Sequence, residues 1–465
     1  MQPLPEPLTC FKAYDIRGRL DEDLTEANAY RIGRAFAEVL RAGTVVIGRD
    51  VRPSSDALAM ALADGLAAAG VMVLDLGLSG TEEMYFAVSH HDADGGVCVT
   101  ASHNPLEYNG MKMVRAASAP LSADREMFAI KALAESGAFA ARRPGGAVRD
   151  IADTRTAYVE HCLKFLSISH LKPLKILVNA GNGAAGPTFD ALAAALHARA
   201  APWRFERLHH APDGTFPNGI PNPMLPENQP PTSRAIVTAG ADLGVAWDGD
   251  FDRCFFFDHE GSFIAGEYLV CLLAEVFLEK NAGATIIHDP RTIWATQHAV
   301  AKAGGTAILS RCGHTNIKRG MREHRAIYGG EMSAHHYFRD FFHCDSGMIP
   351  FLLICELLNR RGQTLKSLVE ERAAAFPSSG EINFHVADVG AAIARVDAAY
   401  APIALGRDDT DGLSLVLDGW RFNLRASNTE PLLRLNVEAK GSREAVDKAV
   451  AAISEIVGRS PVRVA

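Results

Sequence analysis

The first third of the chain alternates segments of helical periodicity with short apolar runs. Helical spacing of apolar positions predicts helices, and the continuous apolar runs between them predict buried strands. Strands that alternate with helices form βαβ units, so the pattern predicts an α/β sheet. The predicted helices are 25–42, 54–69 and 81–90, and the predicted strands are 45–50, 71–76 and 96–100.

The same alternation returns twice, and the last hundred residues then change character. Asp418-Gly419, between two short apolar runs, is a hairpin signal, and a final helix is predicted to begin at Ser442. The last part is therefore expected to be α+β. In the middle of the chain the predicted helices are 154–166, 266–279 and 292–303, and the predicted strands are 175–179, 241–247, 285–287 and 306–309.

The length of 465 residues predicts three or four domains. Residues 138–148 are rich in Arg, Pro and Gly and are predicted to be a linker, whereas the proline-rich stretch 212–231 is predicted to be an irregular surface loop. The Gly-rich stretch 181–186 after a strand is interpreted as a close-packed turn, because no matching acidic residue follows it. The expected domains are 1–147, 148–251, 252–368 and 369–465.

Composition limits the classes of partner and the compartment. The net charge of -8 argues against nucleic acid or an anionic membrane as partner. The longest apolar runs are too short to span a bilayer, and residues 1–7 lack the features of a signal peptide. The eight cysteines include no C-x-x-C pair and are interpreted as reduced core thiols. A cytoplasmic protein is expected.

The stretch Thr100-Ala101-Ser102-His103-Asn104-Pro105 is predicted to be a loop that presents Ser102 after a buried strand. A catalytic serine needs a base, a metal or a preformed electrostatic pocket nearby. His103 alone does not make a triad, and the Gly-x-Ser-x-Gly elbow of the α/β-hydrolases is missing. Taken alone, the stretch favours a simple polar turn over a catalytic loop.

Three carboxylates follow the predicted strand 241–247, at Asp248, Asp250 and Asp252. On an extended or turning segment they project to one side, where they repel each other unless a cation neutralises them. Ligation by oxygen alone suits Mg²⁺. An EF-hand is excluded because Arg253 and His259 stand where that loop needs Gly and Glu, and the aromatic neighbours argue against a solvated acidic turn.

Two later loops carry groups suited to a phosphorylated sugar. Glu331, Ser333 and His335 alternate at period two, which would turn them to one face of an extended loop, where they suit vicinal hydroxyl groups. Arg425 is followed by hydroxyl and amide donors that suit a phosphate dianion. Simple polar turns remain alternatives for both loops. The donors after Arg425 are Ser427, Asn428 and Thr429.

These four loops resemble, in order, the active-site loops of the α-D-phosphohexomutases. Thr-Ala-Ser-His-Asn-Pro resembles the phosphoserine loop, Asp-Gly-Asp-Phe-Asp-Arg the metal loop, and Arg-Ala-Ser-Asn-Thr the phosphate loop. Gly-Glu-Met-Ser-Ala-His resembles the sugar loop of the phosphomannomutase/phosphoglucomutase branch. The resemblance covers nearly the whole chain and implies three related α/β domains with mixed sheets plus a smaller C-terminal α+β domain around a central cleft.

The resemblance also implies a role for each matching residue. Ser102 would carry a phosphoryl group, which it exchanges with hexose 1-phosphate and hexose 6-phosphate through a hexose 1,6-bisphosphate that also serves as activator. His103, Lys112 and Arg253 would flank that group, and Mg²⁺ would be held by Ser102, Asp248, Asp250 and Asp252. Phosphohexoses, including mannose and glucose phosphates, are the expected substrates, and a monomer is expected. The residues implied to bind substrate are Tyr14, Arg17, Arg291, His314, Glu331, Ser333, His335, Arg425, Ser427, Asn428 and Thr429.

Arg291 stands where many members of the family have Lys, which leaves a cation with a different contact geometry. Arg49, just past a predicted strand, is a further cation to locate. Two other functions stay open: a hexose-phosphate phosphatase, in which water takes the phosphoryl group, and a sugar-phosphate sensor without catalysis.

Overall fold

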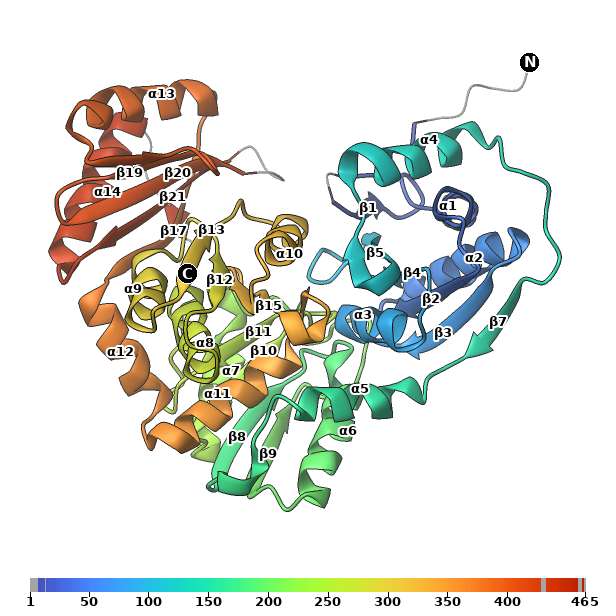
Figure 1. Ribbon diagram of the computed structural model, residues 1–465, viewed down its shortest axis with the longest axis horizontal. Coiled ribbons are helices and arrows are strands. Elements are labelled where there is room, and N and C mark those ends of the chain that lie inside the picture. Colours follow the sequence, from blue (N-terminus) through green and yellow to red (C-terminus); the bar gives the residue numbers. More distant parts are fainter. Residues whose placement is uncertain (1–6, 13, 428–431, 459–461, 464–465) are drawn as a thin grey trace. The chain divides into compact units, whose positions relative to one another are not determined.

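The computed structural model describes residues 7–12, 14–427, 432–458 and 462–463. The chain divides into two compact units, and each unit combines separate stretches of the sequence. Unit 1 consists of the described residues of 1–223, 244–254 and 338–356. Unit 2 consists of those of 224–243, 255–337 and 357–465. Figure 1 labels their elements.

The first sheet of unit 1 is mixed and seven-stranded, in the order β1-β5-β4-β2-β3-β7, with β6 paired to β5. The strands β4, β2, β3 and β7 run parallel, as expected of βαβ units, and β5 runs antiparallel to both of its main neighbours. The strands are β1 (Ile16–Arg19), β2 (Thr44–Arg49), β3 (Met72–Leu78), β4 (Gly95–Val99), β5 (Tyr108–Arg115), β6 (Ala119–Pro120) and β7 (Ala147–Asp150).

Helices cover both faces of this sheet. Gly95 and Gly96 on β4 show this directly, because a Cβ on Gly95 would meet Phe36 of α1 and a Cβ on Gly96 would meet Met84 and Val88 of α3. The helices α1 and α2 lie side by side over the first of these faces. The predicted helices and strands of this region are confirmed. The helices are α1 (Glu26–Leu40), α2 (Pro53–Ala68), α3 (Thr81–His90) and α4 (Phe128–Ser136).

The structure differs from the sequence prediction at the expected linker. Its last residues belong to β7, which pairs in parallel with β3 and so extends the first sheet beyond residue 147. Periodicity missed this strand because it is short and exposed at all four positions. The domain boundaries stay predictions.

The next part of unit 1 is a second α/β sheet, in which β9, β8 and β10 are neighbours and β8 and β9 run parallel. The turn after β8 is closely packed, as expected, because a Cβ on Gly183 would lie 2.8 Å from the carbonyl oxygen of Gly249. The predicted irregular loop ends earlier than expected, since Pro230 begins α7. The elements of this part of the chain, of which α7 and most of β11 belong to unit 2, are α5 (Thr154–Leu163), β8 (Leu174–Asn179), α6 (Ala185–Ala198), β9 (Trp203–Leu208), α7 (Pro230–Ala239), β10 (Leu243–Trp247) and β11 (Cys254–Phe257).

Unit 2 contains a third α/β layer, in which β12 runs parallel to both β13 and β14. The helix α8 is buried along most of its length, which explains its nearly continuous apolar sequence. The chain returns to unit 1 through β15 and reaches unit 2 again along α11. The elements are α8 (Gly266–Lys280), β12 (Thr285–His288), α9 (Trp294–Lys302), β13 (Thr306–Leu309), α10 (His314–Glu323), β14 (Tyr328–Gly330), β15 (His336–Phe338), β16 (Cys344–Asp345), α11 (Met348–Arg361) and α12 (Leu365–Ala375).

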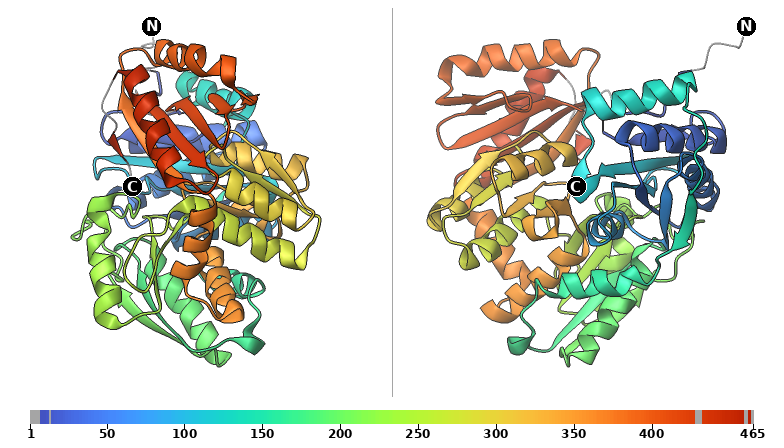
Figure 2. Two further views of the ribbon diagram at one scale, coloured as in Figure 1. Left: turned by 90° about the vertical axis from the view of Figure 1, so that its left-hand side faces the viewer. Right: turned by 45° about the vertical axis from the view of Figure 1, so that its right-hand side comes forward.

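The last sheet of unit 2 is six-stranded, in the order β18-β19-β20-β21-β17-β22, and the predicted hairpin joins β19 to β20. Its apolar side chains pack with those of α13 and α14 in one core, and Figure 2 shows this domain in orange and red. The final helix begins after Ser442, as predicted, with the Ser442 hydroxyl as N-cap. The elements are β17 (Ser378–His385), α13 (Val389–Tyr400), β18 (Gly406–Asp408), β19 (Leu413–Val416), β20 (Trp420–Ala426), β21 (Leu432–Ala439), α14 (Arg443–Val457) and β22 (Val462–Arg463).

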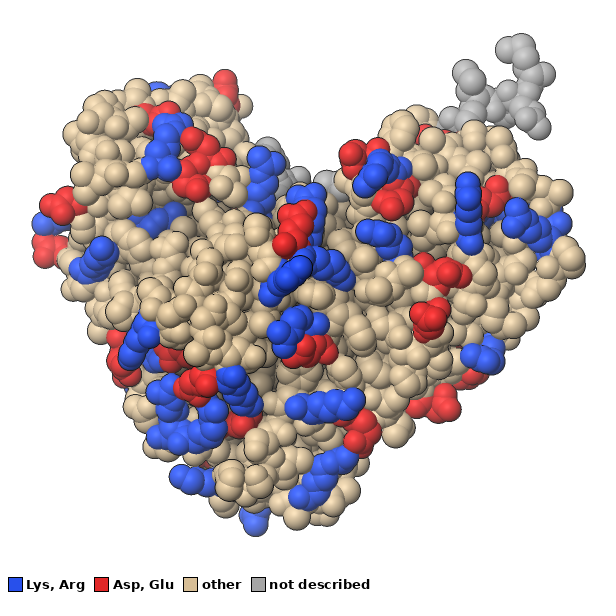
Figure 3. Space-filling model, in the orientation of Figure 1, with Lys and Arg blue, Asp and Glu red and all other residues tan. Residues whose placement is uncertain are grey.

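Three global expectations from composition can be compared with the structure. All eight cysteines are buried free thiols, which confirms their interpretation as core residues. None of the helices in the described ranges has both the length and the apolar character needed to cross a bilayer. Basic and acidic side chains are interspersed on the face drawn in Figure 3.

Candidate active site

Ser102 lies in the loop after β4, as predicted, in a left-handed backbone conformation with φ of 48°. The side chain is buried, and its Oγ donates a hydrogen bond of 2.5 Å to Oδ2 of Asp248. The Ser102 N–H donates to the hydroxyl of Thr100 at 2.8 Å. A non-glycine residue with positive φ is strained and persists only where its surroundings hold it. The loop therefore presents one hydroxyl to a fixed carboxylate.

The loop that carries the three aspartates packs directly on the serine loop. A Cβ on Gly249 would lie 2.4 Å from the carbonyl oxygen of Ser102, so glycine is required for the two backbones to approach. One carboxylate oxygen from each of Asp248, Asp250 and Asp252 lies within 4.8 Å of the others, and all three side chains are buried. We call these three residues the aspartate trio.

Two cations neutralise part of the charge of the trio. Lys112 on β5 donates to Oδ2 of Asp250 at 2.7 Å and to Oδ2 of Asp252 at 2.5 Å. Arg253 donates through Nε and Nη2 to Oδ2 of Asp248 at 2.9 and 2.7 Å. Burial alone would raise the pKa of Asp248 and Asp250, but Arg253 and Lys112 outweigh it and hold both pKa values below the usual range. Asp248 and Asp250 are therefore ionised.

The donor set fits a divalent cation. Three buried carboxylates face only two cationic side chains, and among the described residues Oδ1 of Asp250 has no hydrogen-bond partner. A buried charged oxygen without a partner is costly, and a hard cation that takes oxygen ligands would satisfy it. The structure thus supports the metal interpretation on grounds independent of the sequence motif.

His103 lies beside the serine and is neutral. Its Nδ1 is 3.0 Å from Oγ of Ser102 and accepts a hydrogen bond from Nη2 of Arg253. Burial, and next the charge of Arg253, lower the pKa of His103 to about 4. Since the guanidinium can only donate, Nδ1 is the accepting nitrogen and the ring proton lies on Nε2.

Of the two N-terminal candidates, Arg17 reaches the serine loop. Arg17 on β1 donates to the amide oxygen of Asn104 at 2.9 Å and pairs with Asp15 at 3.0 Å. Its strand pairs with β5, opposite Gly110. Tyr14 is half-buried just before that strand. Arg49, in contrast, pairs with Asp56 and Asp75.

Unit 2 contains a second group of buried acids, which are paired with arginines. Arg291 donates to Oδ2 of Asp289 through Nε at 2.8 Å and through Nη2 at 2.5 Å. Its Nη1 donates to Glu381 at 3.3 Å. Burial alone would lower the pKa of Arg291, but Asp289 outweighs it and holds the pKa well above the usual value. Arg291, the cation predicted at this position, is thus held by ion pairs with Asp289 and Glu381.

The sugar-loop candidates lie on a tight turn, so the extended backbone predicted for them is wrong. The N–H of Glu331 donates to the carbonyl oxygen of His335 at 3.0 Å, and Ala334 adopts a φ of 69°. Period two requires an extended backbone, and this segment folds back instead. Glu331 is buried and accepts from the N–H of Gly313 at 2.7 Å, whereas Ser333 and His335 are half-buried. His314, half-buried, is the first residue of α10, directly after Gly313.

The phosphate-loop candidate Arg425 lies on a polar face of the last sheet. Its Nη2 donates to Oε2 of Glu381 at 2.9 Å, while Arg434 pairs with Oε1 of the same carboxylate at 3.1 Å. Among the described residues, the buried Nε of Arg425 has no hydrogen-bond partner. Ser427 follows β20 and is half-buried. Asn428 and Thr429 lie outside the described residues.

Several residues around these groups were not found from the sequence. Arg52 contacts the serine loop, and Thr81 contacts Asp250. Glu381 and Arg434 lie beside Arg425. A signal for the last two exists: residues alternate along β17, β20 and β21, so an apolar set faces the helices and a charged set faces away. The charged set is Glu381, Arg421, Arg425, Arg434 and Glu438.

Comparisons with known proteins agree with this arrangement. Sequence models of phosphoglucomutase/phosphomannomutase match the chain in four parts: alpha/beta/alpha domain I at 9–141, domain II at 156–261, domain III at 265–376 and the C-terminal domain at 381–456. A phosphomannomutase of Salmonella montevideo is 58% identical, with 93% of this chain and 95% of that protein covered. Phosphohexose mutases of Xanthomonas campestris are 54% identical, with 97% and 99% covered.

Among solved structures, a phosphoglucomutase/phosphomannomutase family protein of Burkholderia thailandensis is similar with a TM-score of 0.86 and 32% identity. The similarity covers 98% of this chain and 99% of that one. A putative phosphomannomutase of Thermus thermophilus gives a TM-score of 0.82 at 25% identity, with 98% and 100% covered.

Proposed function

Because the chain belongs to the phosphoglucomutase/phosphomannomutase family, we propose that it interconverts hexose 1-phosphates and hexose 6-phosphates through a phosphorylated Ser102. Mannose and glucose phosphates are the proposed substrates, and a hexose 1,6-bisphosphate is the proposed intermediate and activator. The chain is proposed to act as a monomer in the cytoplasm.

The contact between Ser102 and Asp248 is the single observation that carries this proposal. A buried hydroxyl donates to a member of the aspartate trio at 2.5 Å, within a cluster whose remaining oxygen suits a cation. Phosphoryl transfer needs little covalent help from a protein and depends on positioning and on neutralisation of charge. A serine held against a metal-type cluster supplies both.

The proposed phosphoryl transfer forms one P–O bond and breaks another. An oxygen of a sugar hydroxyl attacks the phosphorus of phosphorylated Ser102, the new P–O bond forms and the bond from phosphorus to Oγ breaks. The hydroxyl proton leaves to a neighbouring base, and Oγ takes up a proton and becomes the hydroxyl that donates to Asp248. The second half-reaction reverses these changes with the other phosphate of the bisphosphate.

The residues of unit 1 hold the reacting group. We propose that Lys112 and Arg253, besides fixing the trio, turn their remaining N–H groups toward phosphoryl oxygens, and that His103 and Arg17 border the same loop. Mg²⁺ bound by Ser102 and the trio would neutralise charge that develops on the transferred group. Tyr14 is proposed to line the substrate side of this region.

The residues of unit 2 hold the rest of the substrate. We propose that Glu331, Ser333 and His335 bind sugar hydroxyls, and that the distal phosphate is bound by Arg425 with Arg291 nearby. The unpartnered Nε of Arg425 among the described residues supports an anion there. The other proposed donors to that phosphate are His314, Ser427, Asn428 and Thr429.

One distal phosphate site has to serve both orientations of the bisphosphate. A phosphate presents nearly the same oxygens from either side, so a guanidinium that binds it does not depend on the 2-hydroxyl that separates mannose from glucose. Arg425→Ala is therefore expected to weaken the use of both sugars alike, by about 1.5–3 kcal/mol. A large loss in kcat/KM on one sugar with the other spared would show that Arg425 does not hold a shared phosphate.

The phosphoserine is tested by intact mass and peptide mapping of the wild type, Ser102→Ala and Ser122→Ala. Ser122 is a matched control because its Oγ also donates to an aspartate, Asp124, at 2.5 Å, but near the surface. We expect one extra phosphate on Ser102 that Ser102→Ala abolishes together with mutase activity and that Ser122→Ala keeps. A phosphate that maps elsewhere, or release of free phosphate in place of isomerised sugar, would overturn the mutase proposal.

A further inference from the structure

One arginine outside all the sequence motifs lies under the backbone of the serine loop. The guanidinium of Arg52 donates to four carbonyl oxygens of residues 102–108, two from each terminal nitrogen. Nη2 donates to the carbonyl oxygens of Ser102 and Asn104 at 3.1 and 2.5 Å. Nη1 donates to those of Pro105 and Tyr108 at 2.8 and 3.2 Å.

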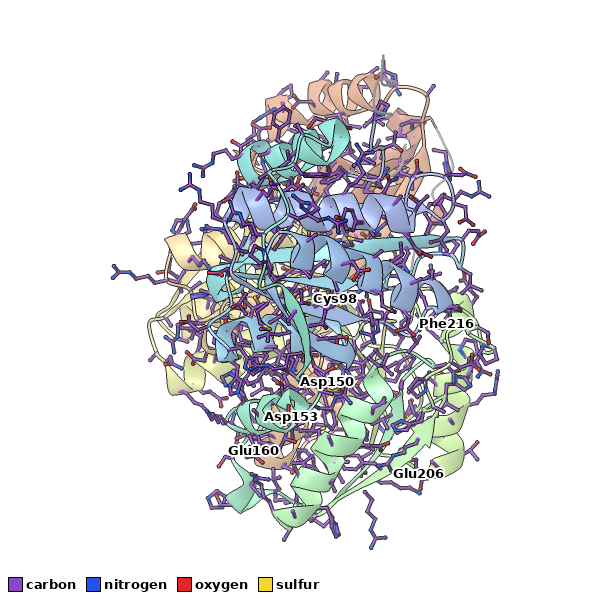
Figure 4. All side chains as sticks on the ribbon, turned by 90° about the vertical axis from the view of Figure 1, so that its right-hand side faces the viewer. Cys98, Asp150, Asp153, Glu160, Glu206 and Phe216 are labelled. Carbon is purple, nitrogen blue, oxygen red and sulfur yellow. The ribbon has the colours of Figure 1, made fainter. Side chains whose placement is uncertain are left out.

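Arg52 is buried, with 3% of its surface exposed. Besides the carbonyl oxygens, two side chains contact its guanidinium group. Nε lies 3.5 Å from Oδ2 of Asp50, a carboxylate that also accepts from the N–H of Ala101. The ring of Phe216 covers the guanidinium, with 5.5 Å between Cζ and the ring centroid. Phe216, labelled in Figure 4, comes from the irregular loop after β9.

The same irregular loop closes on the backbone beside Arg52. A Cβ on Gly214 would lie 2.0 Å from the carbonyl oxygen of Val51, so that loop and the start of α2 are in direct contact. The guanidinium therefore has little freedom to move, and the carbonyls that it binds are held with it. Only a planar group with several fixed donors can bind four carbonyls at once, since an ammonium has three donors on one nitrogen.

We propose that Arg52 is a positioning residue for phosphoryl transfer. It fixes the backbone between Ser102 and Tyr108, keeps Ser102 in its strained conformation and so keeps Oγ against Asp248. This inference rests on the proposed role of Ser102. It concerns a residue that touches neither the reacting atoms nor the aspartate trio, and whose effect on the reaction passes through the backbone of the loop.

A loosened loop would misplace the reacting oxygen and leave the binding of the sugar in unit 2 unchanged. We therefore expect Arg52→Lys to lower kcat by about 10²-fold, with KM changed less than about twofold because the groups proposed to bind the sugar are untouched. A merely structural loss would lower the amount of active enzyme and the thermal midpoint, without a change in kcat per folded, titrated active site.

The experiment compares Arg52→Lys with Arg49→Lys, in steady-state kinetics normalised to the active sites counted by phosphoserine mass. Arg49 is the matched control, three residues earlier on β2, where it is paired with Asp56 and Asp75. Arg49→Lys is expected to keep kcat within about twofold, because its partners lie away from the loop. Equal kcat values for the two variants, or a change confined to KM, would overturn the proposal.

A second variant covers the case in which Arg52→Lys does not fold. Phe216→Leu removes the ring over the guanidinium and leaves all four carbonyl hydrogen bonds in place, so a smaller fall in kcat at unchanged KM is expected. An unchanged kcat in Phe216→Leu would then count against the proposal. The two proposals fail separately: no phosphate on wild-type Ser102 rejects the proposed function, whereas phosphorylated Ser102 with an unaffected Arg52→Lys rejects only this inference.

Discussion

Two groups of buried acids in this molecule differ in what neutralises them. In unit 1 the aspartate trio faces two cations, Lys112 and Arg253, and one carboxylate oxygen has no hydrogen-bond partner among the described residues. In unit 2 three carboxylates face three guanidinium groups. Those carboxylates are Asp289, Glu331 and Glu381, and the guanidinium groups belong to Arg291, Arg425 and Arg434.

The difference shows that the number of acidic side chains does not by itself define a metal site. Asp289, Glu331 and Cys312 also come within 4.8 Å of one another, but Oδ2 of Asp289 already accepts two bonds from Arg291 and one from the N–H of Met332. In unit 2 the three arginines pair with the three acids named above, and they retain N–H groups that suit an anion. The trio of unit 1 has spare oxygen and suits a cation.

The largest effect is expected from removal of Lys112, the lysine that is paired with the aspartate trio. Lys112→Met leaves Asp250 and Asp252 buried without their cation, which should lower the free energy of unfolding by about 3–5 kcal/mol in chelator. Urea unfolding with and without Mg²⁺ measures this. Mg²⁺ should recover part of the loss, since it replaces the missing charge. Arg291→Met, the matched change in unit 2, should be destabilising without recovery by Mg²⁺, and equal recovery in both would contradict the comparison.

Metal binding by the intact trio should have the next largest effect. Mg²⁺ at a hundred times its dissociation constant should stabilise the wild type by about 2.7 kcal/mol, and chelator should stop turnover. Asp250→Asn is expected to abolish both responses, because it removes the charge of the carboxylate that has the spare oxygen. Glu381→Gln is the control in unit 2 and should keep the Mg²⁺ response. Full activity of Asp250→Ala in chelator would reject the metal site.

A third buried acid is neutralised by neither a metal nor an arginine. Oε1 of Glu82 at the start of α3 accepts from the N–H groups of Gly347 and Met348 at 3.0 and 3.2 Å. Burial raises the pKa of Glu82 to about 8, so the folded protein holds a proton that the unfolded chain releases above pH 4.5. Stability should therefore fall between pH 4.5 and 8, by up to about 1.4 kcal/mol per pH unit.

Glu82→Gln tests this, because an amide keeps the acceptor oxygen and cannot ionise. Its unfolding free energy should exceed that of the wild type by an amount that grows as the pH rises from 4.5 to 8 and is constant above it. The conservative change Glu22→Gln, on an exposed carboxylate paired with Arg19, should show no such trend. A difference independent of pH would mean that Glu82 is ionised in the folded protein.

The smallest effect is expected from removal of a hydroxyl group that donates a hydrogen bond to the aspartate trio. The hydroxyl of Thr81 donates to Oδ2 of Asp250, and the Thr81 N–H donates to the carbonyl oxygen of the same residue at 3.1 Å. Thr81→Val should weaken Mg²⁺ binding by about 1 kcal/mol, measured by calorimetric titration. Thr81→Ser keeps the hydroxyl and should bind as the wild type does, and equal weakening in both variants would assign the effect to packing.

The serine loop and the aspartate loop were predictable from the sequence. Ser102 follows a buried strand as expected, the aspartate trio comes together, and the cations Lys112 and Arg253 lie beside it. Within each loop the residues are neighbours in the chain, so the short segment between them limits where their side chains can lie. Lys112, in contrast, reaches Asp250 from 138 positions away. The same holds for the hairpin at Asp418-Gly419, whose register depends on two residues.

The geometry of Glu331, Ser333 and His335 was not predictable from spacing. A period of two places side chains on one face only if the backbone is extended, and here the N–H of Glu331 bonds to His335 and closes a turn. That bond depends on local backbone angles, including the positive φ of Ala334, which no residue type in the segment specifies. The strand β7 was missed for a related reason, since its pairing with β3 and not its composition defines it.

What the sequence by itself determined is the chemistry available: a serine, three aspartates, and arginines in recognisable loops after predicted strands. The tertiary structure alone decided which partners surround them. Arg52 reaches the carbonyl oxygen of a serine 50 positions away, and Thr81 reaches Asp250 across 169 positions. No local pattern encodes such contacts, because they arise when elements far apart in the sequence are packed together and buried polar groups must find partners wherever the packing places them.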